Sequence, residues 1–189
     1  MSKEFLRDRQ RALEDVFFVQ QNQALRRSLK EAEEKNSKKD ALAAASGVTD
    51  DAVLEKLVAL GMDASTLAAL TLAPLVLVAW ADGTMHEKER EAALSAAAEV
   101  GVEKGSASHQ LLERWLSTKP PPQLLAAWTD YVHAITPTLS EQRKQQLKAD
   151  LLDRAHKVAG AAGGILGVGS KTSSVEKEML ARLEKAFHA

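Results

Sequence analysis

The sequence predicts an all-α protein, built as a helical bundle with a long N-terminal helix. Aromatic residues make up only 4% of the 189 residues, and alternating runs of β-branched residues are absent, so little in the chain favours strands. Alanine, leucine, glutamate, lysine and glutamine dominate, and these residues form helices readily. Apolar residues make up 45% and charged residues 27% of the chain, which is the range of a folded globular protein.

The first part of the chain, residues 1–47, predicts a helical arm. Its first helix should extend to the mid-thirties along a narrow apolar stripe that Leu25 and Leu29 continue loosely. The polar stretch 30–39 has almost nothing to bury, so it predicts a solvated helix extension or a hinge. A separate short helix is expected over Lys38–Ser46. The arm either binds a partner, pairs with itself or folds onto the bundle.

The remaining residues, 48–189, predict a helical bundle domain. Thr49 is expected to cap a helix over Asp50–Leu60. The stretch Ala64–Ala81 holds no charged residue, and a helix that is apolar all round suits the centre of a bundle. A membrane segment is the alternative, but the stretch barely reaches spanning length and contains Pro74. We therefore expect membrane contact to be at most peripheral.

Further helices are expected wherever a start or stop signal appears. They cover residues 84–100, 106–117, 123–135, 140–159 and 174–188. The three tryptophans of this domain are expected to anchor its core rather than to line a pocket. They are Trp80, Trp115 and Trp128.

Two of these helix starts look alike. Thr84 with Glu87 and Ser173 with Glu176 each fit a capping box, and each follows an apolar run. The similarity suggests a pseudo-duplicated arrangement in which the two equivalent turns lie near each other.

The run Leu77–Arg90 consists of an apolar helix end, an Ala-Asp-Gly turn and an acidic helix start. It resembles the signature of TerB-like domains, the tellurite-resistance-associated family, and the resemblance extends over about residues 63–189. It implies an all-helical fold with an internal repeat, and metal binding through acidic residues at the turns. The second turn reads Ser170-Lys171-Thr172 and carries no acid.

The candidate metal ligands are Asp82, Glu87 and Glu89, because carboxylates near a turn suit Ca²⁺ or Mg²⁺. The alternative is structural: Asp82 ends one helix, Gly83 supplies a left-handed turn and Glu87 completes the next cap. The EF-hand spacing is absent, and the zinc motif H-E-x-x-H is incomplete because residue 90 is an arginine.

A second resemblance concerns residues 1–47. The segments 5–14 and 41–47 are similar to the zeta-type inhibitors of bacterial F-type ATPases. In that family the N-terminal helix is the inhibitory element, so the resemblance implies an ATPase regulator that acts through the arm.

The remaining observations narrow the class of function. The absence of cysteine excludes disulfides, thiolate metal sites and cysteine nucleophiles. No nucleophile elbow, P-loop or dinucleotide fingerprint is present, so no enzyme, no catalytic residue and no organic cofactor are predicted.

A net charge of -1 gives no reason to expect nucleic acid as a partner. A charged N-terminus without an apolar signal core predicts the cytoplasm. The sequence thus favours a protein-interaction role in a stress-related or membrane-associated assembly. The alternative functions are a metal-ion-binding regulator and an ATPase regulator that acts through the N-terminal helix, and a homo-oligomer is compatible with each.

Overall fold

The protein is all-α, as the sequence predicts. The computed structural model describes residues 2–161 and 172–188, and for residues 2–22 it describes the backbone alone. Within those ranges every regular element is a helix. The α-helices are α1 Ser2–Ser46, α2 Asp51–Ala59, α3 Leu67–Thr71, α4 Ala73–Ala79, α5 Glu87–Glu99, α6 Ala107–Ser117, α7 Leu124–Ile135, α8 Glu141–Ala161 and α9 Ser174–Lys185, and the 3-10 turns are η1 Ala64–Thr66 and η2 Thr136–Thr138.

The core of the bundle surrounds α4. Six of its seven residues are buried, and the helix packs against α7, α8 and α9 as well as α5 and α6. The predicted burial of the charge-free stretch is therefore confirmed. The prediction of one continuous helix there is wrong, because the chain breaks at Leu72 between α3 and α4. Pro74 explains the break, since its ring clashes with the carbonyl one turn earlier and it has no amide hydrogen.

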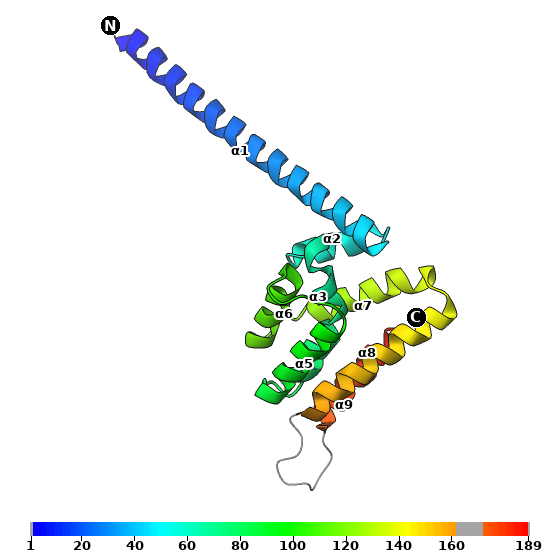
Figure 1. Cartoon of the computed structure of the whole chain (residues 1–189). Coiled ribbons are helices and arrows are strands. Elements are labelled where there is room, and N and C mark those ends of the chain that lie inside the picture. The colour runs from blue at the N-terminus through cyan, green and yellow to red at the C-terminus, as the bar shows by residue number, and fades with distance from the viewer. Residues whose placement is uncertain (1, 162–171, 189) are drawn as a thin grey trace.

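α1 is one uninterrupted helix of 45 residues. Of the two alternatives for the polar stretch 30–39, the solvated helix extension is observed and the hinge is not, because no proline or glycine stands there and the residues present form helices well. The prediction of a separate helix over Lys38–Ser46 is wrong. Figure 1 shows α1 projecting away from the bundle, so it does not fold back onto the other helices. Only its end joins the domain, where Leu42 is fully buried and Lys39 Nζ lies 2.5 Å from Asp51. Every described side chain from residue 23 to residue 38 is exposed.

Most of the expected helix boundaries fall within a residue or two of the observed ones. Gly61 and Gly101 follow the ends of α2 and α5 with positive φ angles of 77° and 83°, as the stop signals predict. The cap of α2 is Asp50 rather than Thr49, because the Asp50 carboxylate accepts from the amides of Ala52 and Val53. A carboxylate at this place also benefits from the helix dipole.

Trp115 and Trp128 are core residues, as predicted. The Trp128 ring meets that of Phe187 edge to face, with centroids 6.1 Å apart, a favourable aromatic geometry. Trp80 is only half-buried. Among the described residues, no helix is both long enough and apolar enough to cross a membrane.

Candidate functional site

The turn after α4 is held by its tryptophan. Trp80 caps α4, and its indole Nε1 donates a hydrogen bond of 2.7 Å to the carbonyl of Trp115 in α6. Gly83 follows with φ +91°, a conformation that residues with a Cβ rarely adopt. The turn that resembles the TerB-like signature is thus fixed to a neighbouring helix.

Asp82 has a local structural role in this turn. Its Oδ1 accepts a hydrogen bond of 2.9 Å from the amide of Thr84, and its Oδ2 lies 3.9 Å from Nε2 of His86. The residue is exposed to solvent. This bond, from an aspartate to the amide two residues later, is the usual way in which aspartate stabilises a turn.

α5 begins two residues later than the predicted capping box requires. The backbone stays extended through His86 (φ -86°, ψ 142°), and the first helical residue is Glu87. The carboxylate that reaches back is Glu89, whose Oε2 accepts from the amide of His86 at 3.1 Å. The pairing of Thr84 with Glu87 is therefore wrong, because Asp82 already holds the Thr84 amide outside the helix.

The start of α9 is as predicted. Ser173 Oγ accepts from the amide of Glu176 at 3.2 Å, and the Glu176 carboxylate accepts from the amide of Ser173. These reciprocal bonds form a complete capping box. The corrected correspondence between the two starts is therefore His86 with Ser173 and Glu89 with Glu176.

The two corresponding glutamates meet inside the protein. Glu89 is 2% exposed and Glu176 is 6% exposed, and they are two of the three buried polar or charged residues in the described part of the chain. Their carboxyl groups lie close enough for Glu176 to raise the pKa of Glu89. The two helix starts thus lie near each other, with a register two residues later in the first one. Ser170 and Lys171 of the second turn lie outside the described residues.

This contact requires a proton. The pKa of Glu89 is raised to about 7, chiefly by burial; the bond from the His86 amide opposes the rise, and the hydrogen bond and negative charge of Glu176 add to it. Two carboxylates that touch away from water cannot both stay ionised without strong repulsion. Glu89 therefore holds a proton up to about neutral pH, which makes the contact between the starts of α5 and α9 pH-dependent.

The three predicted metal ligands point to different surroundings. Asp82 and Glu87 are exposed, whereas Glu89 is turned into the protein towards Glu176. Within the described residues, no three histidine, aspartate or glutamate side chains gather in a way that could hold a metal ion. Metal binding by these residues stays a prediction.

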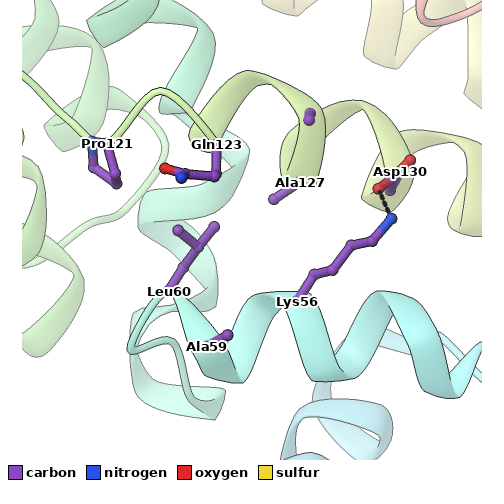
Figure 2. Close-up of a pocket in the computed structure, with 8 residues that line it drawn as sticks. Lys56, Ala59, Leu60, Pro121, Gln123, Ala127 and Asp130 are labelled. Carbon is purple, nitrogen blue, oxygen red and sulfur yellow. Dashed lines mark hydrogen bonds and ion pairs between the residues drawn. The ribbon is translucent and has the colours of Figure 1, made fainter.

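An open apolar groove lies between α2 and α7 (Figure 2). Its volume is about 610 Å³, and Leu60, Ala127 and Pro121 contribute apolar surface. The Nζ of Lys56 and the Oδ2 of Asp130 form an ion pair of 2.6 Å across one end. The sequence does not predict this groove, because the paired residues stand 74 positions apart and nothing local connects them.

A smaller hollow of about 200 Å³ adjoins the Trp80 turn. Trp80, Met179 of α9 and the proline run 120–122 line part of it. The Trp80 turn is therefore an accessible surface feature as well as a helix junction.

Comparisons with known protein families, with curated proteins and with solved structures find no match to this chain.

Proposed function

We propose that this protein is a non-enzymatic, TerB-like interaction protein that works in the cytoplasm, in a stress-related or membrane-associated assembly. The bundle is the folded body, and α1 is the arm that contacts a protein partner. The mechanism is docking through helix faces, without covalent chemistry.

The exposure of α1 carries this proposal. Leu25 and Leu29 are 58% and 56% exposed on a helix that touches the bundle only at its end. Large apolar side chains that lie free on an extended helix are a common feature of binding surfaces. The bundle does not need them, since its own core is complete without them.

The proposal is tested by affinity capture with the full chain and two variants. Leu25→Gln combined with Leu29→Gln removes the two large apolar side chains that are exposed on α1 and leaves the charge of the arm unchanged. Arg27→Gln combined with Glu31→Gln is the matched control, because it also preserves net charge and lies on another face of the same helix. A specific partner should be lost with the first variant and retained with the second. A set of captured proteins that is identical for all three chains would contradict the role of the arm.

A second candidate is a metal-ion-binding regulator that uses the start of α5. The buried contact between Glu89 and Glu176 favours it, because a divalent cation could replace the proton on Glu89 and bind both carboxyl groups. Asp82 and Glu87 would then serve as outer carboxylates on the same turn.

This candidate is tested by titration with Ca²⁺ or Mg²⁺, followed through tryptophan fluorescence and thermal unfolding. Wild type should respond at millimolar ion, Glu89→Gln should not, and Glu87→Gln should respond weakly. No response of the wild-type protein would sink the metal hypothesis and leave the interaction proposal standing.

A further inference from the structure

The exposed part of α1 makes little contact with the rest of its own chain. From residue 23 to residue 38 every side chain is exposed. Two exposed ion pairs support the stretch: one of 3.8 Å between Lys30 and Glu34, and one of 3.4 Å between Lys35 and Glu55 of α2. Isolated helices are only marginally stable in water, and one exposed ion pair adds a few tenths of a kcal/mol. A helix of this length is therefore expected to find a partner along this stretch.

The sequence of this stretch has the spacing of a coiled coil. Positions separated alternately by four and three residues carry apolar side chains or asparagine, and we call this set the seam. The seam consists of Phe18, Asn22, Leu25, Leu29, Ala32 and Asn36. Such alternation places all six positions on one side of a supercoiled helix, where they correspond to the a and d positions of a heptad.

We propose that the seam pairs with the same seam of a second copy of this chain, as a parallel and in-register coiled coil. This inference rests on the proposed role of α1 as an arm. Leu25 and Leu29 then form its central apolar layers. Asn22 and Asn36 both fall at a positions, where asparagine side chains can hydrogen-bond across the two helices and fix their register.

The charged residues that flank the seam favour the parallel arrangement. In register, Ser28 stands opposite Glu33 of the second copy. Lys35, whose Nζ lies 3.4 Å from Glu55 of its own chain, stands opposite Asp40 of the second copy, so no like charges meet at these positions. An antiparallel pairing that matches Leu25 with Leu29 would instead bring Arg26 against Arg26 of the second copy. Like charges placed opposite each other disfavour such a pairing.

The bundle leaves this side of α1 free. Leu42 and Lys39 mark the side of the helix that faces α2 and the core. Leu25, Leu29 and Asn36 lie roughly 90° further round the helix at 100° per residue. A second helix can therefore approach the seam as far as Asn36, and the seam ends where Lys39 turns to the acids of α2.

The first test measures the mass of the full chain by light scattering and sedimentation over a range of concentrations. We expect a dimer with an affinity of roughly micromolar, because the seam is short and includes two asparagines. Leu25→Gln with Leu29→Gln should weaken the dimer at least about 100-fold, since four buried leucines per dimer are lost. Arg27→Gln with Glu31→Gln should leave it unchanged, because these residues occupy outward f and c positions.

The second test fixes the orientation with single cysteines, which are unique because the chain has none. Asn22→Cys should form a disulfide with itself in a parallel dimer, and so should Ala32→Cys. In the antiparallel pairing, residue 22 lies opposite residue 32 of the second copy, and two residues 22 stand about 15 Å apart. That distance is too long for a disulfide, so only a mixture of the two variants would cross-link, as a 22–32 product.

Self-cross-linking together with loss of the dimer in the leucine variant supports the proposal. A monomer at about 100 μM, a 22–32 product, or a dimer that survives the leucine substitutions overturns it. The test also separates this inference from the proposed function. A monomer whose arm still captures another protein would contradict the pairing alone, whereas a dimer that captures nothing would leave the pairing and contradict the docking role.

Discussion

α4 and α1 are opposite kinds of helix in one chain. α4 has seven residues, of which six are buried, whereas α1 has 45 residues and a long exposed stretch. A helix as short as α4 does not form alone in water, so contacts with its neighbours must stabilise it. The bundle stabilises α1 through few contacts, so the helicity of α1 depends on its own residues and on any helix that pairs with it. The same secondary structure thus has two different physical origins here.

The largest effect expected from this difference comes from one substitution made in both regions. Leu75 of α4 is 1% exposed and Leu29 of α1 is 56% exposed. Leu75→Ala should lower the free energy of unfolding by about 2–5 kcal/mol, because it leaves a cavity in a packed core. Leu29→Ala should change it by less than about 0.5 kcal/mol at a concentration where the chain is monomeric. Urea unfolding of both variants measures the two values, and equal costs would mean that α1 packs on the bundle in solution.

The next effect concerns a charge inside the bundle, in contrast to the many exposed charges of the arm. Burial raises the pKa of Glu89 to about 7 in the folded protein, from an ordinary value of 4.5. The folded state therefore binds more protons than the unfolded state between these values, and its stability should fall as the pH rises from about 5 to 8. The loss should be of the order of 1–3 kcal/mol, at about 1.4 kcal/mol for each pKa unit.

Glu89→Gln should flatten this pH dependence. The amide can still accept from His86 through its oxygen, and it can donate to the Glu176 carboxylate without any proton uptake. Glu87→Gln is the matched control in the same turn of α5, and it should keep the wild-type profile because Glu87 is exposed. Urea unfolding at several pH values compares the three proteins. A wild-type profile that is flat between pH 5 and 8 would contradict the raised pKa of Glu89.

A smaller effect separates the two helix starts. Ser173→Ala should cost about 1 kcal/mol, because the hydroxyl accepts from the Glu176 amide at 3.2 Å and that donor loses its partner. Thr84→Ala should cost much less, because in the structure Thr84 stands before the helix and only its backbone amide is bonded. Thermal unfolding of the two alanine variants measures the difference. Equal costs would restore the sequence-based assignment of Thr84 as the cap.

Composition and local signals were enough to predict the class of fold and most helix positions. Helix-forming residues, capping side chains and glycines act over a few neighbours, so Gly61, Gly101 and the Ser173 cap could be read directly. The helix starts that were predicted at the wrong residue depend on competition between neighbouring capping side chains. Asp50 competes with Thr49 for the cap of α2, and Asp82 takes the Thr84 amide before the helix begins.

The carboxyl pair was predictable only in part. The similarity of the two helix starts suggested that they lie close together. The residue of the first start that contacts Glu176 is, however, Glu89 and not the predicted Glu87. A stronger signal was present: Glu89 stands four residues before the buried Ala93, and Glu176 stands four residues before the buried Leu180. Acids in line with an apolar stripe lie on the buried face of a helix. The α2–α7 groove had no such signal, because it depends on how distant helices pack.

The smallest expected effect is that of removing most of the arm, residues 2–34. The bundle should keep its unfolding free energy within about 0.5 kcal/mol, because Lys39 and Leu42 remain and no described side chain of residues 23–34 packs on the core. Pairing through α1 would also make the stability of the full chain depend on its concentration. A dimer favours its folded state more strongly as concentration rises, so the full chain should gain thermal stability with concentration while the shortened chain should not. If the thermal stability of the two proteins changed with concentration in the same way, α1 would not pair with a second copy.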